Sequence, residues 1–201
     1  MSLNLQTEKT FVIIKPDGVQ RGLVGDIISR IEKTGLKLVT LKMTAVDEDT
    51  LYKHYNKDDE WYASKGAKVM SSMEKNNIPV TKEAIEYGKD IIRALVSYMT
   101  SGPVVMMVWE GNESVAIVRK IVGGTEPTTA DIGTIRADYT LESIYLANMQ
   151  NRAVRNLIHA SEIVEDSTRE IGLWLKAEEI MDYTHVQELL LYGEMFTGFK
   201  K

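Results

Sequence analysis

The chain has 201 residues, of which 44% are hydrophobic and 26% charged, an ordinary composition for one globular domain. Its formal net charge of −5 gives no electrostatic basis for gripping nucleic acid, so a phosphate site would have to gather its cations locally. The sequence contains no cysteine, which excludes disulfides, thiolate metal sites and a cysteine nucleophile.

The first part of the chain alternates between strand and helix patterns. A β-branched and aromatic run ends at Lys15 and is followed by the turn signal Pro16-Asp17-Gly18. Asp47 is a preferred residue for capping the start of a helix. The predicted elements are a strand at 10–15, a helix at 22–34, a half-buried strand at 36–46 and a short helix ending at Tyr55.

The second part contains two irregular blocks. Residues 56–80 are polar and mixed, and we expect them to be helical in part; residues 140–154 resemble an inserted, loosely helical segment. The remaining predicted elements are a helix at 81–100, a buried strand at 103–109, a helix at 115–122, a loop to about 135, a short strand at 156–159 and a helix at 164–175.

Without the irregular blocks, strands and helices alternate, and the core order is βαββαβ. This order predicts an α/β protein of the α+β type, with a ferredoxin-like antiparallel sheet and helices packed on one face. The sequence shows no internal repeat and no Pro/Gly-rich linker, so we expect a single domain over 1–201.

The sequence also bears on location. Its longest apolar run, 104–109, falls far short of the roughly 18 residues that a membrane-spanning helix needs. The N-terminus is polar and shows no targeting pattern, and the absence of cysteine fits a reducing compartment. We therefore expect a cytoplasmic protein with no membrane and no nucleic-acid partner.

Candidate reactive residues lie at the ends of predicted strands. His159 ends a short apolar strand directly before a helix start, a position that favours bound anions, whereas His54 and His185 are expected to be surface or partly packed residues. Lys15, Arg119 and Arg136 are cations beside mostly apolar segments. If the strand ends converge, these cations and His159 would form a phosphoryl-transfer site, although neither a GxxxxGK[ST] nor a GxGxxG motif is present.

Six sequence blocks, in order, resemble the signature blocks of nucleoside diphosphate kinases. The resemblance spans the chain from Thr10 to Tyr183, and the first block together with N-x-x-H-x-S is highly specific. The blocks are KPDGVQRGLVG (15–25), SGPVVMMVWEG (101–111), VGGTEP (122–127), GTIRAD (133–138), NLIHAS (156–161) and REIGLWL (169–175).

The resemblance implies a ping-pong exchange in which a nucleoside triphosphate phosphorylates His159 and a nucleoside diphosphate removes the phosphate. Glu170 falls on the carboxylate that orients the imidazole. Residues implied to bind the phosphates and ribose are Lys15, Tyr55, Arg119, Thr125, Arg136 and Asn156. Magnesium ion would arrive with the nucleotide, without a metal site of the protein. The resemblance also implies a ferredoxin-like fold and a homo-oligomer, either a hexamer or a tetramer.

The implied chemistry suits these residue types. A phosphate on a ring nitrogen keeps a transfer potential near that of a nucleotide anhydride, so the exchange can run either way. Cations at Lys15, Arg119 and Arg136 would neutralise charge on the transferring oxygens. Because the base would meet only a stacking face, we expect broad base specificity.

The chain departs from the family pattern at several positions. Ala137 and Ala160 replace glycines, and we expect these changes to be tolerated. Ile163 replaces a serine that usually helps to hold the catalytic carboxylate, so Glu170 is expected to be held less tightly. Residues 56–89 and 139–153 are interpreted as insertions. The first interrupts the region of the base-stacking aromatic residue; Trp61 is the candidate for that role, whereas a continuous alignment would put Ile91 there.

Two other readings remain open on the sequence. A non-catalytic relative could keep the fold and bind nucleotides without turnover, although every catalytic position is filled. A regulatory nucleic-acid binder is disfavoured by the acidic balance of the chain.

Overall fold

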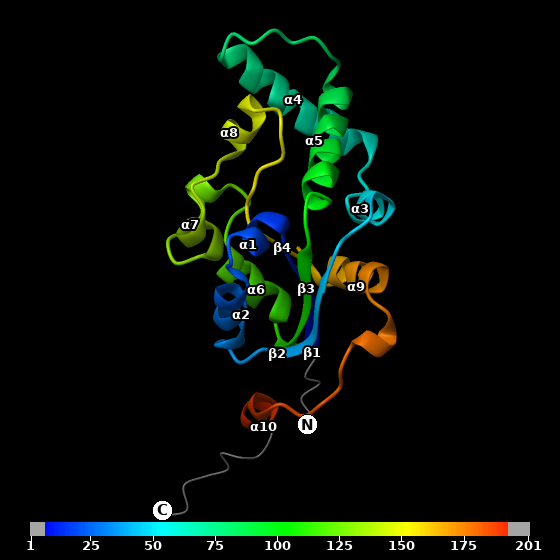
Figure 1. The fold of residues 1–201 in the computed structure, drawn as a ribbon, viewed down its shortest axis with the longest axis vertical. Coiled ribbons are helices and arrows are strands. Elements are labelled where there is room, and N and C mark those ends of the chain that lie inside the picture. The colour runs from blue at the N-terminus through cyan, green and yellow to red at the C-terminus, as the bar shows by residue number, and fades with distance from the viewer. Residues whose placement is uncertain (1–6, 193–201) are drawn as a thin grey trace, which may run out of the picture.

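The computed structural model describes residues 7–192 and centres on a four-stranded antiparallel sheet (Figure 1). The ends of the predicted domain, 1–6 and 193–201, lie outside the described residues. The strands are β1 (Thr7–Ile14), β2 (Lys37–Thr44), β3 (Val104–Asn112) and β4 (Ile158–Ala160). Their order in the sheet is β2-β3-β1-β4, with every neighbouring pair antiparallel. This order is ferredoxin-like and confirms the predicted fold class.

The helices follow the predicted pattern, with two short additions. The α-helices are α1 (Pro16–Gln20), α2 (Val24–Glu32), α3 (Glu48–His54), α4 (Asp59–Lys75), α5 (Ala84–Met99), α6 (Ser114–Val122), α7 (Ile135–Tyr139), α8 (Ile144–Met149), α9 (Val164–Trp174) and α10 (Val186–Tyr192). The short 3-10 helices are η1 (Pro127–Thr129) and η2 (Ala177–Glu179). Asp47 caps α3 as predicted, accepting a hydrogen bond from the backbone N–H of Thr50. Helix α1 occupies the predicted turn, and α7 lies between the predicted loop, which ended at about 135, and the irregular block at 140–154.

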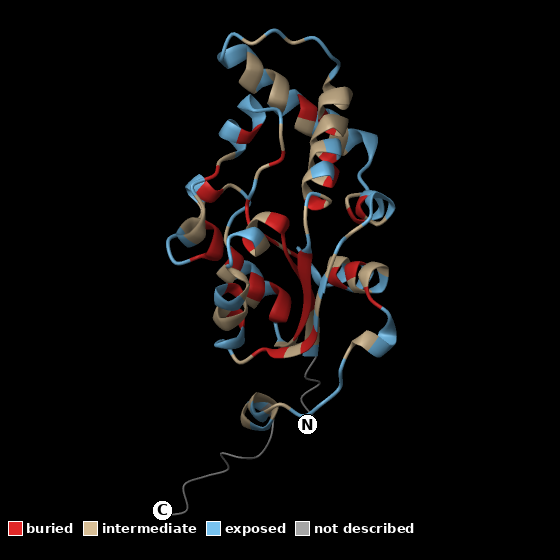
Figure 2. Ribbon diagram, in the orientation of Figure 1, coloured by how far each residue is buried: buried red, intermediate tan, exposed pale blue. Residues whose placement is uncertain are grey.

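Helices cover both faces of the sheet, so the prediction that they pack on one face was wrong. Val12 and Ile14 of β1 face the cluster that contains α2 and α6, whereas Phe11 and Ile13 face the cluster that contains α3, α5 and α9. All four side chains are fully buried. Figure 2 shows most of the central strand β3 coloured as buried, between the two helical layers. A strand segment buried on both faces is continuously apolar, as residues 11–14 of β1 are.

Helices α4 and α5 form a hairpin whose far end extends away from the sheet (Figure 1). The two helices cross at backbone contact because glycines lie at the crossing. A Cβ on Gly66 would stand 1.6 Å from the carbonyl oxygen of Ala84, and one on Gly88 would stand 2.1 Å from that of Tyr62. Side chains cannot separate the helices at this point, so the hairpin is expected to behave as one stiff unit.

Among the described residues, none of the helices has both the length and the apolar character that a membrane crossing requires.

Candidate functional site

His159 lies on the short edge strand β4, paired with Ile13 of β1. The chain enters this strand through a strained turn. Leu157 has φ +69, and the N–H of Ile158 donates to the carbonyl oxygen of Asn156 at 2.8 Å across it. A three-residue turn with positive φ at a fully buried leucine is costly, and such geometry persists where surrounding contacts enforce it. The turn lies directly between Asn156 and His159, two of the predicted site residues.

The imidazole of His159 is held by one carboxylate. Its Nε2 lies 3.1 Å from Oε2 of Glu170 on α9, and the same oxygen accepts a 2.6 Å hydrogen bond from the hydroxyl of Ser161. Burial alone would raise the pKa of Glu170, but the bonds from His159 and Ser161 outweigh it and lower that pKa to about 2. The carboxylate is therefore ionised, and Nε2 carries the proton that it accepts. Nδ1 is left as the nitrogen with a lone pair.

The structure shows which hydroxyl holds Glu170, while the expectation that this residue is held less tightly than in the family pattern stays a prediction. Ile163, which stands where a serine was expected, is 54% exposed and precedes the first turn of α9. Ser161 supplies a hydroxyl, because the chain after β4 turns its buried side chain toward the carboxylate. Glu170 itself is 4% exposed.

His54 is not a surface residue but a buried neighbour of His159. The two rings meet edge to face with centroids 4.7 Å apart, and Nδ1 of His54 accepts a 3.1 Å hydrogen bond from the indole N–H of Trp174. Burial and the neighbouring His159 lower the pKa of His54 to about 3, so the ring stays neutral. A neutral ring packed against His159 restricts its orientation without adding charge. His185 lies where expected, directly before α10.

Lys15 stands at the end of β1, almost fully buried, and its Nζ donates to Oδ1 of Asn156 at 2.7 Å. Burial, with repulsion from Arg136, lowers the pKa of Lys15 to about 7, and Asp17 opposes the shift only partly. A buried ammonium with a neutral amide partner lacks a matched anion. A bound phosphate would provide one.

Arg136 and Asn156 form the wall beside Lys15. The guanidinium donates to the backbone carbonyls of Asn156, Gly123 and Ile158 at 3.2, 2.7 and 2.7 Å. The amide of Asn156 donates to the carbonyl of Thr125 at 2.9 Å. Arg136 thereby stabilises the strained turn at Leu157 that precedes His159. Burial, together with repulsion from Arg119, lowers the pKa of Arg136 to about 10.

The remaining predicted residues surround this cluster. Tyr55 lies against the edge of His54, and its hydroxyl is buried without a hydrogen-bond partner, a state that raises its pKa. Thr125 contacts Asn156 through its backbone. Arg119 is half-exposed on α6, 3.8 Å from Glu162.

The two candidates for base stacking lie on different helices. Trp61 begins α4, where its ring meets Tyr62 at a right angle and has Lys57 and Lys65 near its faces, 5.9 and 5.7 Å from its centroid. Ile91 lies on α5 and faces the segment after α8, beside a small cavity that Asn151 also lines. Neither contact decides between the two, so the stacking residue stays a prediction.

Sequence reasoning missed Asp17 and the hydroxyl role of Ser161. The carboxylate of Asp17 accepts hydrogen bonds from the hydroxyl of Tyr98 and from the N–H of Leu157, at 3.2 Å for the latter, and so ties α1 to the strained turn. Asp17 and Tyr98 also border a cavity of about 690 Å³ between α1, α5 and residues 140–155. The sequence around Asp17 indicated only a turn. Its hydrogen-bond partners, Tyr98 and Leu157, are distant in the chain and could not be recognised from the local sequence.

Candidate metal ligands also meet in this region. The side-chain nitrogen and oxygen atoms of His54, His159 and Glu170 lie within 4.8 Å of one another. Nδ1 of His54, however, accepts the Trp174 hydrogen bond, and Glu170 accepts from both His159 and Ser161. These lone pairs are engaged within the protein, which favours a proton-handling cluster over a metal centre.

A histidine with one free ring nitrogen, fixed by a carboxylate and bordered by buried cations, defines a site for phosphoryl transfer on a ferredoxin-like sheet. The family model for nucleoside diphosphate kinase matches residues 8–92 and 82–180. The chain belongs to the nucleoside diphosphate kinase family, which consists of transferases.

Named relatives match this chain over nearly its whole length. A nucleoside diphosphate kinase of Pyrobaculum aerophilum is 45% identical over 183 residues, covering 89% of this chain and all of the relative. One from Borreliella burgdorferi is 38% identical over 181 residues, covering 90% of this chain and 95% of the relative.

Solved structures agree with these matches. The crystal structure of an NDP kinase from Pyrobaculum aerophilum superposes with a TM-score of 0.83 at 44% identity, covering 88% of this chain and all of that one. The transition-state mimic of the enzyme from Borrelia burgdorferi, with bound vanadate and ADP, gives a TM-score of 0.77 at 37% identity, covering 93% and 98%.

Proposed function

We propose that this chain transfers the γ-phosphate of a nucleoside triphosphate to a nucleoside diphosphate through a phosphohistidine on His159. The observation that carries the proposal is the hydrogen bond between Nε2 of His159 and the ionised Glu170, which leaves Nδ1 free as the nucleophile. The family match and the vanadate-ADP complex of the Borrelia burgdorferi relative support it.

The exchange balances as two mirror-image steps. The Nδ1 lone pair attacks the γ-phosphorus while the bond from that phosphorus to the bridging oxygen breaks, and the nucleoside diphosphate leaves with the electron pair. A second diphosphate then attacks the phosphohistidine through a terminal β-oxygen, and the ring nitrogen recovers its lone pair. Glu170 accepts the Nε2 hydrogen bond throughout and stabilises the positive charge that the ring acquires.

Lys15, Asn156 and Arg136 are proposed to receive the phosphates, with Arg119 and Thr125 at the outer side and Tyr55 near the ribose. Protonated Lys15 would exchange its amide partner for a phosphate oxygen, and Arg136 keeps the turn before His159 in place. These groups are already positioned before the reaction, so charge on the transferring oxygens is stabilised without rearrangement.

Magnesium ion is proposed to arrive bound to the nucleotide. The carboxylate next to His159 is that of Glu170, whose Oε2 accepts from His159 and Ser161 and whose Oε1 lies 3.5 Å from the guanidinium of Arg169. Mg²⁺ prefers carboxylate and phosphate oxygens, so the nucleotide itself offers better ligands than this cluster. The magnesium ion would neutralise negative charge on those phosphate oxygens that Lys15, Arg119 and Arg136 do not contact.

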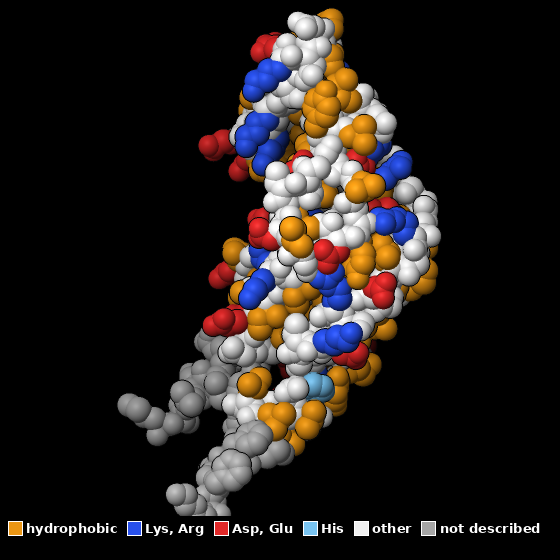
Figure 3. Space-filling view, turned by 90° about the vertical axis from the view of Figure 1, so that its left-hand side faces the viewer, with side chains coloured by type: hydrophobic (Ala, Val, Ile, Leu, Met, Phe, Trp, Pro, Cys, Tyr) orange, Lys and Arg blue, Asp and Glu red, His pale blue; other side chains and the backbone are white. Residues whose placement is uncertain are grey.

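We also propose a homo-oligomer, hexamer or tetramer, formed by a single-domain cytoplasmic chain. Large apolar side chains are exposed in the segment that contains α7 and α8, among them Ile132, Leu141, Ile144, Leu146 and Met149. Figure 3 faces this side of the molecule and shows hydrophobic side chains interspersed with charged ones. Exposed apolar groups at this density favour an association surface.

The test of the proposed reaction is incubation with γ-labelled ATP and magnesium ion. The wild-type chain should take up acid-labile, alkali-stable label and pass it to a nucleoside diphosphate. His159→Ala should bind nucleotide without taking up label, and His185→Ala, the matched control near α10, should be labelled normally. A wild-type chain that binds ADP but takes up no label would instead support the non-catalytic reading.

A further inference from the structure

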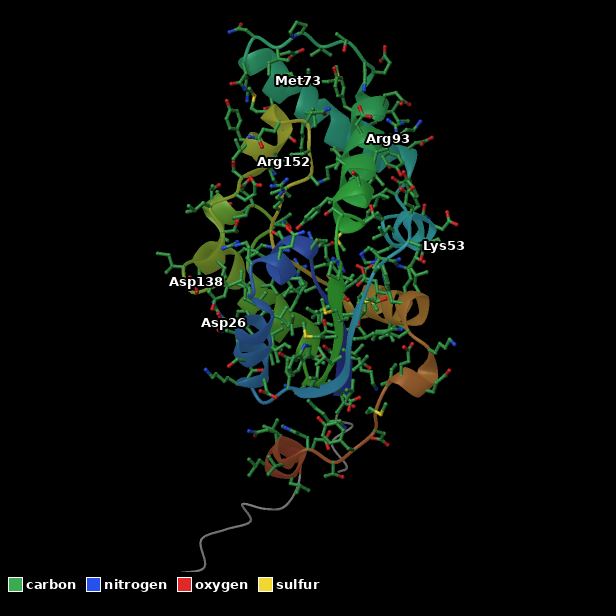
Figure 4. All side chains as sticks on the ribbon, viewed as in Figure 1. Asp26, Lys53, Met73, Arg93, Asp138 and Arg152 are labelled. Carbon is green, nitrogen blue, oxygen red and sulfur yellow. The ribbon has the colours of Figure 1, made fainter. Side chains whose placement is uncertain are left out.

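Residues 56–89 and 139–153, which we interpret as insertions, meet each other in the folded chain. Near the far end of the α4–α5 hairpin, the hydroxyl of Tyr145 on α8 donates to Oδ1 of Asn76, directly after α4, at 3.1 Å. Below this bond, Val69 of α4, Ile91 of α5 and Asn148 of α8 line a small cavity of about 50 Å³. Figure 4 marks the two sides by Met73 on α4 and Arg152 after α8. We call the Tyr145–Asn76 contact and its flanking residues the clasp.

Each of the two elements joined by the clasp is held in place by further contacts of its own. The hairpin is stiff because its helices cross at Gly66 and Gly88 without intervening side chains. Helix α8 is fixed at its start by the N–H of Ile144, which donates to Oε2 of Glu126 at 2.8 Å, and the segment around it is closed by a 2.5 Å ion pair between Glu142 and Arg152. A single contact between two supported elements can therefore set the spacing between them.

These elements form two walls of the cavity of about 690 Å³: α5 contributes Ala94 and Tyr98, and the segment with α8 contributes Leu146 and Asn151. The hairpin follows Tyr55 and returns to the sheet through the buried half of α5. The segment after α8 leads to Asn156, which contacts Lys15 and Thr125. A nucleotide that touches both walls binds more tightly when their spacing is set in advance, because less ordering remains to be done on binding.

We propose that the clasp holds the two walls of the nucleotide site at their binding distance, with Tyr145 and Asn76 as positioning residues. This inference rests on the proposed function for the location of the nucleotide. The affinity of a ligand that contacts both walls, such as ADP, should depend on the clasp. A small phosphoryl donor such as phosphoramidate needs only the surroundings of His159 and should not depend on it.

The first experiment compares Tyr145→Phe with Tyr183→Phe. Tyr183 is a matched control, since its hydroxyl also makes one exposed hydrogen bond, to the carbonyl of Leu38 at 3.0 Å, far along the chain from the clasp. Calorimetry with ADP should show Kd raised roughly 2- to 10-fold in Tyr145→Phe, the range expected for one lost hydrogen bond, and unchanged in Tyr183→Phe. The rate of phosphorylation by phosphoramidate should be equal in both variants and the wild type.

A second experiment restores the clasp by a covalent link. The chain has no cysteine, so a double variant, Asn76→Cys with Tyr145→Cys, offers a unique thiol pair for a short bismaleimide. Before cross-linking, its Kd for ADP should be raised like that of Tyr145→Phe; after cross-linking, Kd should return to the wild-type value or below. Mass spectrometry of the intact chain confirms the link.

The inference is overturned if Tyr145→Phe and Tyr183→Phe bind ADP equally, or if cross-linking leaves the weakened Kd unchanged. It is also overturned if Tyr145→Phe slows phosphoramidate and ATP reactions by the same factor, since that result indicates general disturbance of His159. Failure of the proposed function is separate: a wild-type chain without label from ATP would refute turnover, while the ADP measurements would still test the clasp.

Discussion

Raising the pH above 7 should weaken nucleotide binding because Lys15 must be protonated to meet a phosphate. Burial and Arg136 lower the pKa of this lysine to about 7 in the free protein. A phosphate partner should restore it toward the ordinary value of about 10.5, so binding between these values takes up one proton. At about pH 8.5 the free lysine is about 1.5 pH units above its pKa, and the cost is roughly 30-fold in Kd, or about 2 kcal/mol.

Calorimetric titration of ADP from about pH 7.5 to 9 tests this expectation, in buffers of different ionisation enthalpy so that proton uptake is counted. Lys15→Arg is the control, because a guanidinium stays protonated and its Kd should be nearly flat. The pH dependence of folding runs the other way from that of binding. Because folding lowers the pKa of Lys15, the unfolding free energy rises with pH from about 7 upward. Loss of ADP binding at alkaline pH would therefore not be caused by unfolding linked to this lysine. A flat wild-type Kd without proton uptake would refute the assignment of Lys15 as the buried phosphate partner.

Three further outcomes are expected. The pKa of Glu170, lowered to about 2 on folding, contributes at most about 3 kcal/mol of stability, which is present above about pH 4.5 and is lost as pH falls toward 2. Glu170→Gln should lose that acid dependence in urea titrations and should slow phosphorylation by ATP about tenfold or more. Unchanged values in both assays would contradict the role of Glu170. Gly88→Ala should lower the unfolding free energy by about 1–3 kcal/mol, because the added Cβ would meet the carbonyl of Tyr62, whereas Gly172→Ala on α9, with open space around it, should raise it by about 0.5–1 kcal/mol. The kcat/KM values for ADP, GDP, CDP and UDP should lie within about two orders of magnitude, less than ~3 kcal/mol, and a single accepted base would instead indicate base reading by the insertions.

Much of the fold could be predicted because its signals are local. Asp47 capped the helix that its sequence indicated, and the apolar periodicities placed α2, α5, α6 and α9 within a few residues. One missed element also carried a local signal: Thr134, a preferred capping residue, accepts from the N–H of Ala137 and starts α7. The apolar run at 11–14 in β1 was also a local signal for a strand covered on both faces, which the prediction of helices on one face did not use.

Other features depend on residues distant in the chain and could not be predicted. His54 is buried by Trp174 and His159, more than a hundred positions away. The Pro16-Asp17-Gly18 segment is a helix whose carboxylate bonds to Tyr98 and Leu157, while locally it carries only a turn signal. Whether Ile163 or Ser161 supports Glu170 is decided by the path of the chain after β4.

The most direct test of the account is to identify the phosphorylated atom. The intact protein, phosphorylated by ATP and examined by ³¹P NMR with peptide mapping, should carry its phosphate on Nδ1 of His159, since Nε2 is occupied by the hydrogen bond to Glu170. Phosphate on Nε2 of His159, or on any other residue, would contradict the account.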